Sequence, residues 1–478
     1  MSDLAALEAA LRRDFARLNH PPAAWVPEHA GPDGSSIADV AIVGAGMCGL
    51  AAAFALRRLG IASICHVDRH QAGFEGPWLT YARMKTLRSP KHLTGPVQGI
   101  ANLTYRAWWE AQHGEAAWQA LGRIRRADWM NYLRWYRRVT GAEVQNRVEV
   151  TSVAPGLDAT VLKFHHPDGT AETLHARHVV LATGREGQAR ARVPGALAPY
   201  VGTIVRHSAD DIDFAALKGH RVAVIGLAAS AFDNAATALE AGAAEVTLIG
   251  RAAALPRLNK MKQTVYPGFT HGFPALPDSD KLRFLRHIAG QRIAPPRDSV
   301  LRISADPRLR LLLGAAITGA GPVGQGLRLE TTAGPVEADL VILGTGFAID
   351  LDVPPETADF ASHILRWRDR VPDEDTGEWL DFPYLGPGFE FLEQKSGALP
   401  GLERIHCFTH SAQLSLGNLA NDIPMIGEGA QRLAEAIARA LFVEDRVHHW
   451  QRLVAYDDPE LLGDEWPGLS DWDPPLGG

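Results

Sequence analysis

Apolar and polar positions along the chain follow two periodicities, and their order predicts two βαβ units. A continuous apolar run at 38–43 predicts a short buried strand, and small and apolar residues at 47–59 predict a helix. Residues 61–67 predict the next strand, which ends at Asp68. From residue 220 the same order returns in "HRVAVIG", "SAFDNAATALEAG" and "EVTLIGR", and no repeat of short period accompanies it.

The remaining segments predict helices and antiparallel strands around these units. Residues 104–138 are rich in Trp and Arg and have helical spacing in "DWMNYLRWYRRV". Residues 146–184 alternate and turn like antiparallel strands, and 326–347 return to strands. Residues 427–442 predict a last helix.

Composition narrows the function classes. The chain has 478 residues, 46% of them hydrophobic, which is enough for two or three domains, and its net charge of −7 favours neither a nucleic-acid binder nor an anionic-membrane binder. Its three cysteines form no Cys-x-x-Cys pair and no metal-ligand cluster, which indicates a reducing compartment. The first twenty residues lack the pattern of a signal peptide, and no run reaches membrane-spanning length. We therefore expect a soluble, cytoplasmic protein without a metal site.

The stretch "AIVGAGMCGL" carries a Gly-x-Gly-x-x-Gly pattern between the first predicted strand and helix. Gly44 permits the tight turn, Gly46 lets a pyrophosphate approach the backbone, and Gly49 lets the helix pack closely on the strand. Asp68 ends the next strand, where a carboxylate accepts from ribose hydroxyls. The alternative is a glycine-tolerant turn with Asp68 as a helix cap. Because the loop stands between strand and helix, we favour a dinucleotide site.

The second unit carries an imperfect version of the pattern, in which alanines replace the middle and third glycines. Gly226 keeps the first position, and Ala228 and Ala231 occupy the other two. The following strand ends in Arg251, which can pair with the 2′-phosphate of NADP, whereas an acid there would favour NAD. We favour NADPH binding; the alternative is a structural Rossmann unit with Arg251 solvated.

Two nucleotide loops with a pair of ATG-like strand ends, Ala182-Thr183-Gly184 and Gly344-Thr345-Gly346, resemble the two-dinucleotide-binding flavoproteins over roughly residues 38 to 440. Within that group the chain resembles the class B flavin monooxygenases. "GPWLTYARMKTLRSP", the Gly-x-x-x-Ser-Ala form of the second loop and "RRADWMNYLRWY" carry this resemblance, the last being similar to a helix of the amino-acid N-hydroxylases. "YVGTIVRHS" resembles the Phe-x-Gly-x-x-x-His fingerprint, but with Tyr200 for Phe and one extra residue before His207.

The resemblance implies a fold and a reaction. The fold class is α/β, with two Rossmann-like (three-layer ββα) dinucleotide-binding domains, the NADPH domain inserted in the FAD domain, plus a helical segment. NADPH reduces FAD, O₂ adds to the reduced flavin, and a C4a-(hydro)peroxyflavin transfers one oxygen to a small molecule. N-oxygenation of an amine or amino acid is favoured. The alternatives are a Baeyer–Villiger or aromatic or heterocycle hydroxylating monooxygenase, and a flavoprotein NAD(P)H reductase.

The same resemblance divides the chain and assigns its partners. The predicted divisions are an N-terminal helix and leader (1–35), a first FAD-binding segment (36–202, with a helical insert at 104–138), the NAD(P)H domain (203–330), a second FAD-binding segment (331–445) and a C-terminal tail (446–478). The expected partners are a small-molecule substrate and O₂, with neither nucleic acid nor membrane. Enzymes of this class often form dimers or tetramers.

The site residues follow from the motifs and from the resemblance. The predicted cofactor-binding residues are Gly44, Ala45, Gly46, Gly49, Asp68, Arg69, Trp78, Arg83, Thr183, Gly184, Gly226, Ser230, Ala231, Arg251, Gly346, Asn421 and Ile423. Arg88, Lys91 and His207 are the predicted catalytic residues. Arg88 and Lys91 lie in a cationic loop that stands beside the flavin in related enzymes, where a cation can hold a substrate carboxylate. For each of these cations a solvated surface position is the alternative.

Overall fold

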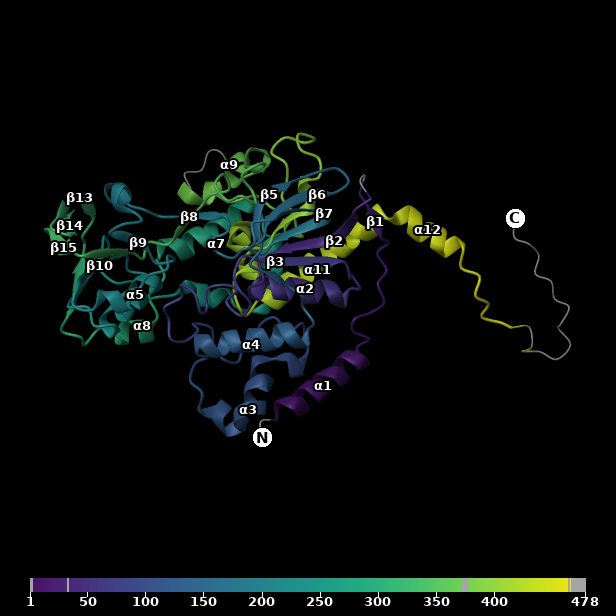
Figure 1. Ribbon diagram of the computed structural model, residues 1–478, viewed down its shortest axis with the longest axis horizontal. Coiled ribbons are helices and arrows are strands. Elements are labelled where there is room, and N and C mark those ends of the chain that lie inside the picture. Colours follow the sequence, from purple (N-terminus) through teal and green to yellow (C-terminus); the bar gives the residue numbers. More distant parts are fainter. Residues whose placement is uncertain (1–2, 32–33, 372–376, 463–464, 466–478) are drawn as a thin grey trace.

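A computed structural model describes residues 3–31, 34–371, 377–462 and 465 of the chain. Two sheets of mainly parallel strands form the body, with helices packed on them (Figure 1). The mixed α/β architecture with Rossmann-like sheets confirms the predicted fold class. The first sheet and its helices form the first lobe, and the second sheet and its helices form the second lobe.

In the described residues the first sheet has eight strands in the order β4–β3–β2–β7–β6–β5, with β1 beside β2 and β18 beside β7. Its strands are β1 (His29–Ala30), β2 (Ser36–Val43), β3 (Ile64–Asp68), β4 (Gln145–Asn146), β5 (Glu149–Ala154), β6 (Thr160–His165), β7 (Ala171–Leu181) and β18 (Ile405–Cys407). β2 lies between β3 and β7 and is parallel to both. β6 pairs antiparallel with β7, and β5 pairs antiparallel with β6, as their alternating pattern predicts.

The second sheet has five described strands, all parallel, in the order β12–β11–β10–β16–β9. They are β9 (Val205–His207), β10 (Arg221–Ile225), β11 (Glu245–Gly250), β12 (Leu309–Leu313) and β16 (Leu340–Leu343). A small antiparallel sheet of β13 (Ile317–Val323), β14 (Gly326–Thr331) and β15 (Val336–Ala338) packs on the face of this sheet that is opposite α5 (Figure 1). Two crossover strands, β8 (Ala189–Ala191) and β17 (Phe347–Ile349), pair antiparallel where the chain leaves and re-enters the first lobe.

The described helices are α1 (Leu4–Arg17), α2 (Met47–Arg58), α3 (Tyr105–Ala120), α4 (Arg126–Val139), α5 (Ala229–Glu240), α6 (Pro267–Gly272), α7 (Asp278–Gly290), α8 (Arg297–Leu301), α9 (Trp367–Arg370), α10 (Gln413–Leu416), α11 (Ile426–Glu444) and α12 (Arg446–Val454). α1, α3 and α4 lie together below the first sheet (Figure 1). Trp108 of α3 and Trp129 of α4 pack with Tyr105 and Tyr132 in a buried aromatic cluster, so these tryptophans belong to the hydrophobic core.

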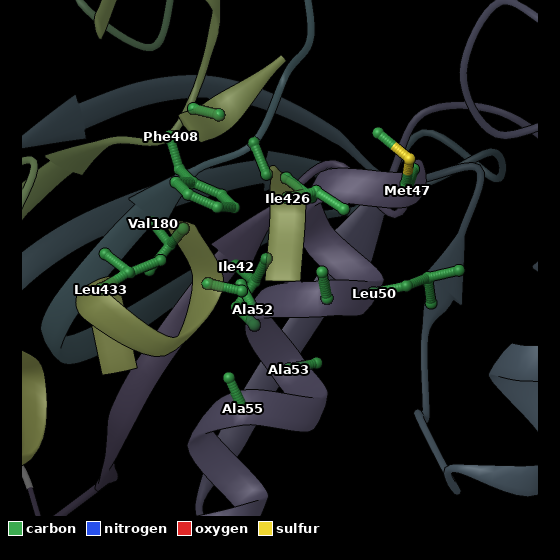
Figure 2. Close-up of a cluster of buried hydrophobic side chains, with 14 of the residues drawn as sticks. Ile42, Met47, Leu50, Ala52, Ala53, Ala55, Val180, Phe408, Ile426 and Leu433 are labelled. Carbon is green, nitrogen blue, oxygen red and sulfur yellow. The ribbon is translucent and has the colours of Figure 1, made fainter. Parts of the chain in front are cut away.

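Small residues along α2 let it lie close to both the first sheet and α11. Ala52 and Ala53 of α2 are buried, and α11 packs against this helix. Figure 2 shows Ile426 and Leu433 of α11 with Val180 and Phe408 beside α2. Helix α2 therefore joins the N-terminal and C-terminal halves of the first lobe, and its first turn is held firmly in place.

The second sheet extends further along the chain than the predicted domain boundary. We expect the return to the first lobe at residue 331, but β16 pairs with β10 and β9, so residues up to Leu343 belong to the second lobe. Periodicity alone does not show this, because β16 reads as a buried strand of either sheet. In the predicted tail, Arg446–Val454 forms α12, which projects away from the body (Figure 1).

Candidate active site

The first glycine loop has the geometry of a phosphate-binding turn. Gly44 has a φ of +100°, and a Cβ there would lie 2.5 Å from the carbonyl oxygen of Ala182. A Cβ on Gly49 would lie 1.8 Å from the carbonyl oxygen of Gly44, so only glycine lets α2 pack this closely on β2. By contrast, a Cβ on Gly46 would meet nothing nearer than the Cα of Gly76, at 3.7 Å. Gly46 and Gly76 thus leave an open cradle at the start of α2, where a pyrophosphate can approach the backbone.

Asp68 stands at the end of β3 and is buried beside this loop. Its two carboxylate oxygens accept hydrogen bonds from the backbone N–H groups of Ala45 and His70, each at 2.7 Å. Burial raises the pKa of Asp68, but the hydrogen bonds with His70 and Ala45 prevail and hold it below its usual value. The carboxylate is therefore ionised at neutral pH and fixes the turn, with lone pairs left for a ribose hydroxyl.

The loop that follows β3 covers the cradle. Gly76 has a φ of +76°, and Trp78 beside it packs edge-on against Trp129 of α4. Arg126, at the start of α4, donates to the carbonyl of Trp78 and fixes the loop on the helical insert. Arg69 reaches Glu186 at 3.5 Å. The predicted FAD residues Arg69 and Trp78 thus lie around the first glycine loop, and their contact with a cofactor stays a prediction.

The second loop repeats the geometry with smaller differences than its sequence suggests. Gly226 has a φ of +127°, and a Cβ there would lie 2.5 Å from the carbonyl oxygen of Gly344, as Gly44 faces Ala182. Ala231 packs so tightly that a Cβ on Gly344 would lie 2.6 Å from its Cβ. Ala228 caps α5 with its methyl group exposed, and Ser230 lies in the first helical turn. The second loop therefore keeps the shape of the first, with the Ala228 methyl group at the position of the middle glycine.

Arg251 lies exposed at the end of β11 and has no ion-pair partner among the described residues. Its charge, after burial, lowers the pKa of Arg192, so the two guanidinium groups lie close together. Arg192 itself pairs with Glu378, which leaves Arg251 the free cation of the two. An unpaired arginine at the end of the second strand suits the 2′-phosphate of NADP.

The ATG-like strand ends lie directly against the glycine loops. The hydroxyl of Thr183 is buried without a hydrogen-bond partner among the described residues, which suits a polar group of a bound dinucleotide. Gly184 and Gly346 have φ values of +76° and +74°. Because the carbonyl of Gly346 accepts from Arg192 N at 3.0 Å, the two crossovers are tied together.

The cationic loop 83–91 contacts the second lobe of the molecule. Arg88 reaches Asp233 of α5 at 3.9 Å, and Lys85 pairs with Glu240 at 2.7 Å. Arg302 donates both to the carbonyl of Arg83 and to Asp233, each at 3.2 Å. The loop thus joins the two lobes. Arg88 keeps about half of its side chain exposed, at 52%, so it can still reach a ligand.

Two predicted catalytic residues have other partners, and the first is Lys91. Its ammonium group donates to the carbonyls of Trp118 and Gln119 and lies 4.8 Å from the ring centroid of Trp118. It therefore caps the C-terminus of α3, where a cation meets the negative end of the helix dipole. This position argues against a catalytic Lys91, since the loop turns its side chain toward the helical insert.

His207 has both ring nitrogens engaged in the crossover. Nε2 lies 3.2 Å from the carbonyl oxygen of Gly346 and donates to it, and Nδ1 accepts from Ala209 N at 3.3 Å. Burial lowers the pKa of His207, so the ring is neutral. Asp210 accepts from the backbone N–H of His207. These contacts make His207 a packing residue of the crossover and give its catalytic assignment no support.

The segment before α11 closes over the first loop. Cys48 of α2 donates to the carbonyl of Ala420 at 3.1 Å, which holds this segment above the helix N-terminus. Asn421 lies 2.6 Å from His410 Nδ1, and Ile423 is buried. Burial raises the pKa of Asp422 to about 6. This loop therefore lies against the start of α2, next to the first glycine loop.

Three residues of the site were not predicted from sequence. His66 Nε2 lies 3.0 Å from the carbonyl oxygen of Gly44 and supports the loop from behind. The buried carboxylate of Asp233 in α5 accepts hydrogen bonds from the Ser299 hydroxyl at 2.6 Å and from Arg302. Because Arg302 also contacts Arg83 of the first lobe, Asp233 anchors the joint between the two lobes. Arg185 follows the first ATG-like strand end and lies near His410. Only Arg185 had a sequence signal, its place directly after Gly184.

Metal-ligand groups, disulfides and membrane-spanning helices are absent from the described residues. No described group of three or more His, Cys, Asp or Glu side chains is arranged to hold a metal ion. The cysteines Cys48, Cys65 and Cys407 are all free thiols. No helix in the described stretches of the chain is both long and apolar enough to span a bilayer.

Comparisons with known proteins agree with this geometry. Residues 41–304 match the model of the pyridine nucleotide-disulphide oxidoreductase family. The chain is 38% identical over 468 residues to the FAD-dependent urate hydroxylase of Xanthomonas campestris pv. campestris, covering 97% of this chain and 98% of the relative.

Solved structures share the fold at low identity. The ornithine hydroxylase of Pseudomonas aeruginosa superposes with a TM-score of 0.66 at 17% identity, over 85% of this chain and all of the other. The L-lysine 6-monooxygenase of Pseudomonas syringae gives 0.64 at 19%, over 84% and 99% of the two chains. The bacillithiol disulfide reductase of Staphylococcus aureus gives a lower score of 0.54 at 17%, over 84% and 98%.

Proposed function

This chain belongs to the pyridine nucleotide-disulphide oxidoreductase family, as a flavin monooxygenase, and we propose that it hydroxylates an electron-rich heterocycle of the urate type with FAD and NADPH. The observation that carries the proposal is the 38% identity to a FAD-dependent urate hydroxylase along nearly the whole of both chains. The overall reaction joins one atom of O₂ to the substrate and reduces the other to water, with NADPH supplying two electrons.

The two glycine loops divide the cofactors. The first loop, with its open cradle at Gly46 and the ionised Asp68, suits FAD, which stays bound through the reaction cycle. The second loop, with Arg251 free at the end of β11, suits NADPH. Bound FAD supplies the redox chemistry and the activation of O₂, and the protein orients the reactants and excludes water.

Hydrogen bonds and ion pairs between the two lobes fix their relative position. Asp233 binds Ser299 and Arg302 from α8 and its following turn, and Arg302 also holds the backbone of Arg83. Since Lys85 reaches Glu240 across the same joint, the loop 83–91 is fixed to α5. This joint sets the distance over which a hydride must pass from the second site to the first.

N-oxygenation of an amine or amino acid is the second candidate. The resemblance of "RRADWMNYLRWY" to an N-hydroxylase helix predicts it, and the ornithine and lysine hydroxylases share the fold. The whole-chain identity to a urate hydroxylase supports the heterocycle as the first candidate, because 17–19% identity to the ornithine and lysine hydroxylases supports the fold alone.

A substrate panel separates the two candidates. We expect urate to stimulate NADPH oxidation by the purified holoenzyme, with little hydrogen peroxide and with a product that carries one ¹⁸O atom from ¹⁸O₂. Ornithine and lysine serve as the amine panel. Stimulation by the amines with hydroxylamine formation, and none by urate, would establish N-oxygenation instead. NADPH oxidation that yields only hydrogen peroxide with every compound would count against both.

A further inference from the structure

Arg185 is a charged side chain that faces His410 of the segment before α11. Arg185 follows Gly184 in the crossover from β7, and its side chain is exposed to solvent. Even so, surrounding protein lowers its pKa, chiefly by desolvation. Solvent therefore reaches this side chain although neighbouring protein desolvates its guanidinium group.

The hydrogen bond that Arg185 makes to His410 leaves most of its donors free. Arg185 Nη2 lies 3.4 Å from Nε2 of His410, which accepts the hydrogen bond. The pKa of His410 lies well below its usual value because of burial and the Arg185 charge, so the ring is neutral. The structure places Nδ2 of the Asn421 amide 2.6 Å from Nδ1 of His410. Because Nδ1 carries the proton when Nε2 accepts, turning this amide by 180° presents its oxygen to Nδ1 as the acceptor. Asn421 thus orients His410, and His410 orients Arg185.

No carboxylate lies within 4.0 Å of Arg185 among the described residues, which sets it apart from its neighbours. Arg88 shares Asp233 at 3.9 Å, and Arg192 pairs with Glu378. Both of these arginines lower the pKa of Arg185 further by repulsion. An arginine held by the fold among other cations, with no counter-ion, creates a site for an anion.

The cofactor phosphates have other sites. In the proposed arrangement the first pyrophosphate would bind at the Gly46 cradle of α2 and the second at the start of α5, with Arg251 for the 2′-phosphate. Arg185 lies instead beside His410 and Asn421 of the segment before α11 and near the cationic loop. These are the two segments that stand nearest the flavin and substrate in the predicted arrangement.

We propose that Arg185 binds the substrate as an anion, and that it selects the ionised heterocycle over neutral ones. The proposal rests on the proposed function: urate loses a ring N–H proton below neutral pH and carries one negative charge, shared over adjacent oxygen and nitrogen atoms. The planar fork of a guanidinium group matches two such adjacent acceptors, whereas an ammonium group offers a point charge. Arg185 is thus a specificity-determining residue, held by His410 and Asn421.

The test measures binding separately from turnover. Oxidised holoenzyme is titrated with urate in the absence of NADPH, and the change in flavin absorbance gives the dissociation constant. We expect R185Q to raise this constant by about 10- to 100-fold, the usual loss for a hydrogen bond to a charged group, with R185K in between. Hypoxanthine, a neutral purine at pH 7, should bind wild type and R185Q alike. R190Q is the matched control, because Arg190 is exposed on the same segment and pairs with Asp350.

The pH profile gives a second readout. Urate binding by wild type should weaken as the pH falls through the first ionisation of urate, and R185Q should show little of this dependence. Equal flavin content and melting temperature establish that the variants fold; if R185Q loses FAD, R185K carries the comparison.

Three outcomes would overturn the proposal, each with a different meaning. If wild type hydroxylates urate and R185Q binds it equally tightly, the Arg185 assignment alone fails. If R185Q raises the KM for NADPH instead, Arg185 holds a cofactor phosphate. If wild-type holoenzyme neither binds nor oxidises urate, the proposed function fails and the assignment fails with it.

Discussion

Replacing Gly49 by alanine tests whether the first loop is held together by close helix–strand packing. The added Cβ would lie 1.8 Å from the carbonyl oxygen of Gly44 and 2.9 Å from Nε2 of His66. Carbon and oxygen atoms rest at about 3.3 Å, so α2 must move by roughly 1.5 Å from β2. The nearest obstacle is backbone, which cannot rotate away, and α2 is also fixed by α11. Overpacking of a core typically costs about 1–3 kcal/mol, and we place this case at about 3 kcal/mol or more.

The matched variant is Gly46→Ala, three residues earlier in the same motif. Gly46 has a φ of −65°, which alanine adopts freely, and its Cβ would meet nothing nearer than 3.7 Å. We expect it to cost less than about 1 kcal/mol of stability, since it only changes the residue that caps α2. Its methyl group would instead fill the cradle and weaken FAD binding by about 10-fold or more.

The assay combines thermal unfolding of the flavin-free protein with FAD titration. For the first lobe of the molecule, about 3 kcal/mol corresponds to a fall in melting temperature of roughly 6–12 °C. Gly49→Ala should show that fall even without FAD, whereas Gly46→Ala should melt like wild type and differ only in FAD affinity. Flavin-free Gly49→Ala melting within about 1 °C of wild type would refute the packing argument.

The remaining predictions concern the second cofactor, a buried ion pair and the C-terminal helix. Arg251→Ala should lower the preference for NADPH over NADH, as the ratio of kcat/KM values, by about 1–3 kcal/mol, while Lys262→Ala leaves it unchanged; an unaltered ratio removes Arg251 from the site. Burial raises the pKa of Glu444, but His178 at 3.6 Å and the cations Arg177 and Arg404 outweigh it and lower the pKa to about 2, so its ionised form stabilises the fold above about pH 4.5 and that contribution is lost as the pH falls toward 2. Glu444→Gln should therefore lower the melting temperature at pH 7, by on the order of 2–3 kcal/mol of stability, and the gap to wild type should narrow below pH 4.5; a gap independent of pH would contradict this. Trp450→Ser should shift the melting temperature by less than about 1 °C, because this side chain of α12 is 64% exposed, and a larger fall would mean that α12 is packed on another surface.

Local rules were sufficient for the cofactor loops. Gly44 and Gly49 are glycines for the reasons that the motif implies, since a Cβ at either position meets backbone at 2.5 Å or less. The open position at Gly46 and the carboxylate at the end of β3 also follow from the pattern. The βαβ order and the helical insert were predicted as well, because each depends on periodicity within a short window.

The catalytic residues were predicted from their positions near the cofactor motifs in the sequence, and the fold gives them other partners. Lys91 turns toward α3, and His207 uses both ring nitrogens in the crossover, although both were predicted as catalytic residues. Arg88 lies at the joint between the lobes beside Asp233, a residue far from it in the sequence. No local pattern links these two positions.

The two dinucleotide loops follow from the sequence, since turn conformation, helix start and strand end are set by residues within about thirty positions of one another. Which charged groups stay without a counter-ion depends on the tertiary packing. Arg185 and its orienting His410 are 225 positions apart, and Arg88 meets Asp233 across the two lobes. Whether a cation is neutralised depends on what the fold brings within about 4 Å of it, and that distance has no counterpart along the chain.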